Sequence, residues 1–211
     1  MFYFVFQSTF KLAEMETRTD YSEDIKTIKR IMEESSRFLS LSGLSGIFAG
    51  ILAFTGGFAA HFLILQNQDV SVLKYEVVSD ALIVLVLALA GSFYFSIRKA
   101  RRKEQKVWTP VSRRLLLNLF IPLISGGFFI LILYIENQWQ LIVPAMLIFY
   151  GLSLVSAGKF TYSEIFYLGL AELITGFLAA IFQESYILFW VLGFGFLHIV
   201  YGLIMYRKYQ G

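Results

Sequence analysis

The chain has 211 residues, and its composition excludes a soluble globular protein. Hydrophobic residues make up 57% of the sequence and charged residues only 16%, against about 25% in soluble domains, and the mean hydropathy is +0.67. A chain of this length cannot bury so much apolar surface inside itself, because its surface-to-volume ratio is too high. The absence of cysteine excludes a disulfide scaffold, and a net charge of +3 does not indicate nucleic-acid binding. The sequence therefore predicts an integral membrane protein.

Residues 1–37 precede the first apolar stretch and are expected to form a cytoplasmic tail. Apolar residues recur in this tail at helical spacing, and an acidic pair resembles a helix-capping box, which predicts an amphipathic helix from about Tyr21 to Ser36. Met1 and Met15 are both candidates for the true start. The apolar residues are Ile25, Ile28, Met32 and Leu39, and the acidic pair is Asp20 and Glu23.

Six apolar stretches are long enough to cross a bilayer, which requires about 20 residues per helix. They lack the alternating pattern of a membrane barrel, and lipid offers the backbone no hydrogen-bond partners, so each is predicted to be a helix. We therefore expect an all-α polytopic membrane protein with a six-helix bundle over residues 38–208. The expected spans are Phe38–Leu65, Ala81–Ile97, Leu115–Ile135, Leu141–Ala157, Tyr162–Phe182 and Tyr186–Tyr206.

The distribution of basic residues predicts the orientation of these spans. Of the 18 lysines and arginines, Lys74 is the only one on the side of the first external connection, and the other 17 lie on the opposite side. Because basic residues accumulate in cytoplasmic loops, both termini are expected in the cytoplasm. The expected location is the bacterial inner membrane, with external connections at residues 66–80, 136–140 and 183–185.

Glycines at matching positions of alternate spans indicate an internal repeat. Setting Gly50 against Gly176 also aligns Gly43 with Gly169. We therefore expect three two-helix hairpins in the same orientation, although small residues also recur wherever membrane helices pack closely. The aligned glycines are Gly50, Gly126 and Gly176 in the odd-numbered spans, and Gly91, Gly151 and Gly202 in the even-numbered spans.

Three stretches of the chain carry a resemblance to a known group of proteins. They are SSRFLSLSGLSGIFAGI, SRRLLLNLFIPLISGG and LFWVLGFGFLHIVYGLIMYRK. With them, the chain after Tyr21 resembles an uncharacterised family of bacterial six-helix inner-membrane proteins, and its layout is weakly similar to HdeD-type acid-stress membrane proteins. The resemblance implies a six-helix membrane fold and brings no activity or functional residue with it.

Glu172 and His198 form the candidate polar site at mid-membrane depth, where ionisable groups are costly and are functional candidates. Counted from Glu184 in the intervening turn, Glu172 lies about 18 Å and His198 about 21 Å along adjacent antiparallel helices, at about 1.5 Å per residue. The two side chains are therefore expected within hydrogen-bond reach of each other. Such a pair can carry a proton or hold a cation or polar head group, or it can serve only as a structural interhelical hydrogen bond.

Weaker polar candidates lie nearer the membrane boundaries. Glu164 is expected at the depth of Arg207, which predicts an interfacial ion pair. His61 and Asp80 flank the first external connection at similar depths, and Asp80 also fits the N-cap of a helix. Asn118, together with the proline that follows it, indicates a local kink in the third span.

The connection after the second span carries eight basic residues. Such a segment sets membrane topology, and it can also face a cytoplasmic protein partner or anionic lipid. Its basic residues are Arg98, Lys99, Arg101, Arg102, Lys103, Lys106, Arg113 and Arg114.

The sequence contains no arrangement of residues typical of an enzyme. Two histidines without cysteine cannot form a four-ligand structural zinc site, and no nucleophile elbow or phosphate-binding loop occurs. We therefore expect no enzymatic activity, cofactor or metal. Two functions stay open: a regulatory, assembly or stress-related membrane protein, or a small transporter or channel with Glu172 and His198 at its midplane.

Overall fold

The computed structural model describes residues 38–66, 70–102, 104 and 107–209, with only the backbone at 70 and 71, together with Ile25, Ile28 and Met32. The chain divides into two units, Met1–Arg37 and Phe38–Gly211. In the first unit the three described residues are helical and exposed. The rest of the predicted amphipathic helix, including its acidic pair, lies outside the described residues, as do Met1 and Met15.

The second unit is helical throughout its spans, and six of its helices are long and apolar enough to cross a membrane. This confirms the prediction of an all-helical membrane protein with six spans. The first five spans are α2 (Gly43–Gln66), α3 (Val70–Arg102), α4 (Pro110–Ile135), α5 (Ile142–Gly158) and α6 (Ser163–Ile181). The last span consists of α7 (Tyr186–Trp190), a π-helical segment η3 (Val191–Leu197) and α8 (His198–Tyr209), and short 3₁₀ turns η1 (Trp139–Leu141) and η2 (Gln183–Ser185) precede α5 and α7.

The first span begins at Gly43, and the prediction that it begins at Phe38 is wrong. Residues 38–42 are not helical. Their backbone is instead bonded to the α5–α6 connection: the Phe38 N–H donates to the Phe160 carbonyl at 2.7 Å, and the Thr161 hydroxyl donates to the Phe38 carbonyl at 2.6 Å. These long-range hydrogen bonds satisfy backbone groups that a helix would otherwise pair, so hydropathy alone could not find the boundary.

Helix α3 is much longer than its apolar core, and residues 70–80, predicted as an external connection, belong to the helix. The charged side chains Lys74, Glu76 and Asp80 end the hydrophobic run without ending the helix. A helix can extend beyond the hydrocarbon core because its backbone hydrogen bonds are internal. The N-cap role predicted for Asp80 is therefore wrong, since Asp80 lies inside α3.

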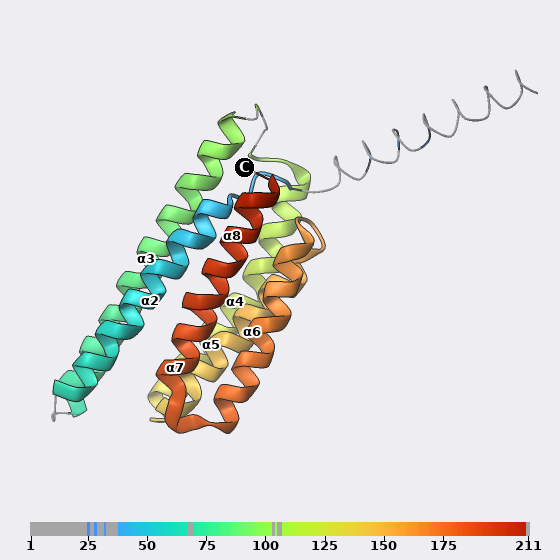
Figure 1. Cartoon of the computed structure of the whole chain (residues 1–211). Coiled ribbons are helices and arrows are strands. Elements are labelled where there is room, and N and C mark those ends of the chain that lie inside the picture. The colour runs from blue at the N-terminus through green and yellow to red at the C-terminus, as the bar shows by residue number, and fades with distance from the viewer. Residues whose placement is uncertain are drawn as a thin grey trace, which may run out of the picture. The chain divides into compact units, whose positions relative to one another are not determined.

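The spans form a chain of neighbours in which two helices are peripheral. Helix α2 packs against α3 on one side and against η3 and α8 on the other, while α5 packs against both α4 and α6 (Figure 1). Helices α3 and α4 pack mainly against α2 and α5 respectively and leave most of their surfaces exposed. The best-buried part of the bundle therefore lies among α5, α6, η3 and α8.

Two pairs of helices cross at glycines with almost no separation between their backbones. Where α8 crosses α2, a Cβ on Gly202 would lie 2.7 Å from the carbonyl oxygen of Gly43. Where α5 crosses α6, a Cβ on Gly151 would lie 2.8 Å from the carbonyl oxygen of Gly169. Real Cβ atoms do not approach backbone atoms so closely, so these crossings require glycine, as is typical of membrane helix pairs.

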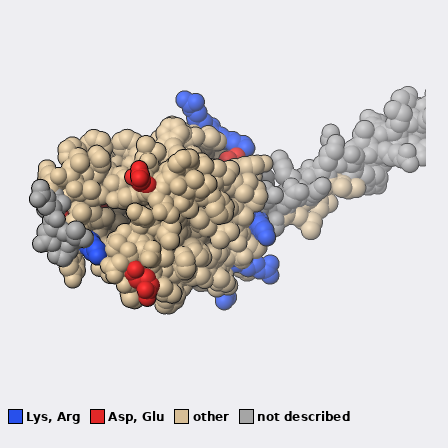
Figure 2. Space-filling model, turned by 90° about the horizontal axis from the view of Figure 1, so that it is seen from below, with Lys and Arg blue, Asp and Glu red and all other residues tan. Residues whose placement is uncertain are grey.

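Charged side chains are unevenly distributed between the two ends of this unit. Figure 2 views the end at which α2 ends and α3 begins, and this end is largely uncharged. The described basic residues other than Lys74 belong to the opposite end, where α3, α5 and α8 finish and α4 begins. The charge asymmetry expected from the sequence is therefore present across the bundle.

Candidate functional site

Glu172 and His198 lie together inside the bundle, as predicted from their equal depth. Glu172 on α6 is 0% exposed and His198, the first residue of α8, is 7% exposed. The distance from His198 Nδ1 to Glu172 Oε1 is 3.3 Å. Neither carboxylate oxygen has a hydrogen-bond donor among the described residues, so this contact is an ion-pair separation without the alignment of a hydrogen bond.

The surroundings of His198 determine which ring nitrogen carries a proton. Its Nδ1 atom lies 3.1 Å from the carbonyl oxygen of Gly193 as well as near Glu172. A carbonyl and a carboxylate oxygen are both acceptors, so Nδ1 carries the hydrogen that faces them. A neutral His198 is therefore assigned a hydrogen on Nδ1, with Nε2 left to accept from Tyr150, whereas the imidazolium carries a hydrogen on both ring nitrogens.

Tyr150 on α5 completes the site, and sequence reasoning missed it. Its hydroxyl lies 2.7 Å from Nε2 of His198, and its ring stacks on the imidazole with centroids 5.4 Å apart. A hydroxyl can donate to a neutral imidazole or accept from an imidazolium, so this contact is compatible with both charge states of His198. A tyrosine in an apolar helix resembles a core aromatic residue, and no spacing rule relates α5 to α8.

Gly193 makes room for the carboxylate. A Cβ at this position would lie 2.6 Å from Glu172 Oε2 and would also overlap the side chain of Leu147, which is fully buried. Gly193 belongs to the π-helical segment η3, and π-helical turns inside membrane and soluble helices frequently occur at functional sites. The carboxylate is fully buried, and no second cationic side chain among the described residues lies beside it.

The arrangement of Glu172, His198 and Tyr150, here named the polar centre, holds acid–base groups from three helices in the buried interior. Glu172 and His198 together are electrically neutral when they share one proton, either as carboxylate and imidazolium or as carboxylic acid and imidazole. Loss or gain of a proton leaves a net charge in an apolar environment, which costs several kcal/mol in effective terms. The chemistry available to the polar centre is therefore proton exchange coupled to its packing.

Glu164 forms an ion pair, but the prediction that Arg207 is its partner is wrong, because the partner is Lys208. Glu164 Oε1 accepts a hydrogen bond from Lys208 Nζ at 2.6 Å and from the Tyr209 hydroxyl at 3.1 Å. Lys208 is the residue next to Arg207, and adjacent helical residues point about 100° apart, so only one of the two side chains faces Glu164. This pair is partly exposed and joins the start of α6 to the end of α8.

The other boundary candidates do not join the polar centre. His61 is exposed near the end of α2, while Asp80 lies beside Gly56, where a Cβ would be 3.4 Å from its Oδ2 atom. Asn118 donates from Nδ2 to the Arg114 carbonyl at 2.9 Å, within its own helix α4, which also contains Pro122. These contacts are local, so they supply no second polar site within the described bundle.

The basic segment separates into residues with different environments. Lys99 is buried, and its ammonium group donates to the Leu41 carbonyl at 2.6 Å and to the Tyr162 hydroxyl at 3.2 Å. The Tyr162 hydroxyl in turn donates to the Leu39 carbonyl at 2.6 Å. Arg98, Arg101, Arg102, Arg113 and Arg114 are exposed, whereas Lys103 and Lys106 lie outside the described residues.

Comparisons with protein-family models, with curated proteins and with solved structures found no match to this chain. The likeness to six-helix inner-membrane proteins therefore stays a prediction from the sequence.

Proposed function

We propose that this multi-pass membrane protein is a non-enzymatic regulatory, assembly or stress-related protein whose polar centre responds to protonation. The observation that supports this proposal is the complete burial of Glu172, with both carboxylate oxygens lacking a hydrogen-bond donor among the described residues. A carboxylate in such a place destabilises its surroundings unless a proton or a cation compensates it. The packing around Glu172 is therefore expected to depend on the protonation state of the polar centre.

The response follows from the charge of the pair. While Glu172 and His198 share one proton, the centre is neutral and compatible with the close packing of Leu147 and Gly193 around it. Without the shared proton, an uncompensated carboxylate faces an apolar interior, and the packed arrangement becomes unfavourable. The bundle is therefore expected to be closely packed while the pair holds its proton and looser when the pair has lost it, and Tyr150 can bond to either charge state of the histidine.

The π-helical segment provides the connection from the polar centre to the rest of the bundle. His198 and Glu172 both contact Gly193 within it, and on its other side Gly195 crosses α2, where a Cβ on Gly50 would lie 2.7 Å from the Gly195 carbonyl oxygen. Such a close crossing cannot absorb a shift of η3 without moving α2. We therefore assign α2 as the element that transmits the change.

Hydrogen exchange in lipid nanodiscs tests this function. Exchange of the amides of η3 and of the facing part of α2 is measured in the wild type and in Glu172→Gln at pH 5 and at pH 9. At pH 9 the wild-type amides are expected to exchange faster than those of Glu172→Gln, and at pH 5 the two proteins are expected to be similar. The comparison with Glu172→Gln at each pH cancels the intrinsic pH dependence of amide exchange. Equal exchange in both proteins at every pH would refute the proposal.

A small transporter or channel is the second candidate, because a buried carboxylate without a donor is also what an occluded proton or cation site requires. Its test is a flux measurement. Proteoliposomes with a pH-sensitive dye inside are expected to hold an imposed proton gradient if the protein is a regulator. Dissipation by the wild type and not by Glu172→Gln would favour transport instead.

We infer that both termini are cytoplasmic and that the inner membrane of a bacterium is the location. Support comes from the 17 of 18 basic residues that belong to one side by sequence. Reporter fusions after Arg102 are expected to be active in the cytoplasm, and fusions in the segment 66–70 to be active outside. A cytoplasmic signal from the second site would overturn this topology.

We also infer that the spans are three repeated hairpins, α2–α3, α4–α5 and α6–α8. Support comes from the two glycine crossings, because Gly43 aligns with Gly169 and Gly202 aligns with Gly151 in the repeat. Between α3 and α4 there is no such glycine crossing: the position of α4 equivalent to Gly43 is Leu119, which packs against the buried cluster of Leu154, Ile165 and Leu168.

A further inference from the structure

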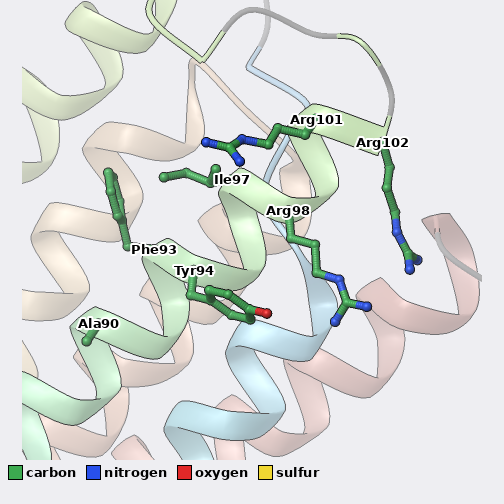
Figure 3. A pocket seen from close by; sticks show the side chains of 7 residues that line it. All are labelled: Ala90, Phe93, Tyr94, Ile97, Arg98, Arg101 and Arg102. Atoms are coloured by element: carbon green, nitrogen blue, oxygen red, sulfur yellow. The ribbon is translucent and has the colours of Figure 1, made fainter.

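One face of α3 combines basic and apolar side chains around a pocket with a volume of about 660 Å³. All of its described lining residues belong to one helix, so the pocket is an open groove on the surface of α3 and not an enclosed cavity. Figure 3 shows the side chains that line it, all from the last part of α3. They follow two neighbouring rows of the helix at four-residue spacing: Ala90, Tyr94, Arg98 and Arg102 form one row, and Phe93, Ile97 and Arg101 form the other.

The basic half of this pocket lacks acidic partners. Arg98, Arg101 and Arg102 are exposed and make no ion pair with any acidic residue that the structure describes. In Figure 3 the Arg98 and Arg101 side chains extend to different sides of α3, so they flank the groove, and a phosphate lying in it would have one guanidinium group on each side. Their charge is complementary to an anion at the membrane boundary.

The apolar half of the pocket lies deeper along the same helix. Phe93 and Tyr94 are 67% and 60% exposed, and Phe93 lies about 13 Å before Arg102 at about 1.5 Å per residue. Helix α3 packs mainly against α2, so in a membrane these aromatic rings face acyl chains. A soluble anion would use the arginines and leave this half empty.

We propose that this face of α3 binds one anionic phospholipid. Arg98 and Arg101 hold its phosphate, Arg102 extends the basic surface, and an acyl chain lies along Phe93 and Ile97 towards the middle of the membrane. The site uses none of the residues of the polar centre, so its test does not depend on the proposed function. A basic cluster immediately next to a membrane helix attracts anionic lipid through its charge, and the pocket gives one lipid molecule a defined position there.

Native mass spectrometry of the full chain in neutral detergent tests the proposal. Phosphatidylglycerol is titrated against phosphatidylcholine with the same acyl chains, and against inorganic phosphate as the source of a free anion. We expect phosphatidylglycerol to bind at least tenfold more tightly than phosphatidylcholine, with no displacement by millimolar phosphate. Since each basic residue contributes about fivefold near an anionic surface, the double variant Arg98→Gln with Arg101→Gln should lose at least tenfold in affinity.

Matched controls distinguish the pocket from general loop charge. Arg113→Gln with Arg114→Gln removes two exposed arginines from the start of α4 and is expected to change phosphatidylglycerol binding less than threefold. Phe93→Ala is expected to weaken binding, whereas Phe120→Ala, at an exposed position on α4, is not. An equal loss in both arginine pairs, or in both phenylalanine variants, would overturn the site.

A second measurement uses only the wild type, in case the double variant does not fold. Raising sodium chloride from 50 to 500 mM should weaken phosphatidylglycerol binding several-fold and leave phosphatidylcholine binding unchanged, because salt screens the arginine–phosphate attraction. Binding that ignores salt, displacement of lipid by phosphate, or full lipid binding by the folded double variant would each overturn the proposal. Full lipid binding by the folded double variant would indicate that these arginines bind an acidic segment of a protein instead.

Discussion

The hydroxyl of Tyr150 lies 2.7 Å from Nε2 of His198, on the opposite side of the imidazole from Glu172. Because of this contact the buried pair of α6 and α8 is also bonded to α5. His198 has a partner at each ring nitrogen, and its position does not depend on the carboxylate alone.

Removal of the tyrosine hydroxyl should destabilise the bundle. Tyr150→Phe leaves Nε2 of a buried histidine without a partner, so we expect a loss of about 1–3 kcal/mol in the free energy of unfolding. Denaturant-induced unfolding in one detergent, followed by helical circular dichroism, measures the change. Tyr201→Phe is the control, because the Tyr201 hydroxyl makes no hydrogen bond with the described residues, and its effect should be much smaller. Equal losses in the two variants would contradict the assigned role of Tyr150.

The glycine crossing between α2 and α8 should not tolerate a methyl group. A Cβ on Gly43 would overlap the backbone nitrogen of Tyr206 and lie 2.6 Å from the Gly202 carbonyl oxygen, and backbone atoms cannot move aside as flexible side chains can. Gly43→Ala is therefore expected to lower the unfolding free energy by about 1–3 kcal/mol.

Gly127 provides the matched control for that substitution. It lies in α4, and a Cβ there would meet nothing within 4 Å. Gly127→Ala should be neutral or should stabilise the helix by up to about 1 kcal/mol, because alanine has the higher helix propensity. Thermal unfolding of both variants in the same detergent decides the matter, and a Gly43→Ala protein as stable as the wild type would show that the crossing is not tight.

Lys99 should hold the non-helical segment 38–42 against the bundle. Lys99→Met keeps an unbranched apolar stem but removes the ammonium group that donates to Leu41 and Tyr162, so we expect a loss of about 1–3 kcal/mol. Limited proteolysis should cut the variant faster near this segment. Arg114→Met, at an exposed position, is the control and should resemble the wild type in both measurements.

The sequence was sufficient where a feature depends on one helix, or on two helices joined by a short turn. Apolar length identified all six spans, and a count of residues from the turn placed Glu172 and His198 side by side. The same argument failed for the partner of Glu164 by one position, because depth along a helix does not determine direction around it. The start of α3 was missed because hydropathy detects the hydrocarbon core and not the helix that extends beyond it.

Contacts between distant helices were beyond the reach of the sequence. Tyr150 lies 48 residues from His198, and no periodicity relates them. Lys99 was grouped with its basic neighbours as a topology signal, although its burial depends on how α3 packs beside residues 38–42. The π-helical register of η3 likewise depends on the fit of its glycines against α2 and Glu172.

The most direct test of the central claim is a double-mutant cycle on the pH dependence of hydrogen exchange in η3. The account predicts that Glu172→Gln abolishes the faster exchange at high pH, because it removes the carboxylate, whereas His198→Gln keeps the carboxylate and retains a response. The double variant should then behave as Glu172→Gln does. Independent and additive effects of the two substitutions, or a pH response that survives in Glu172→Gln, would contradict the account.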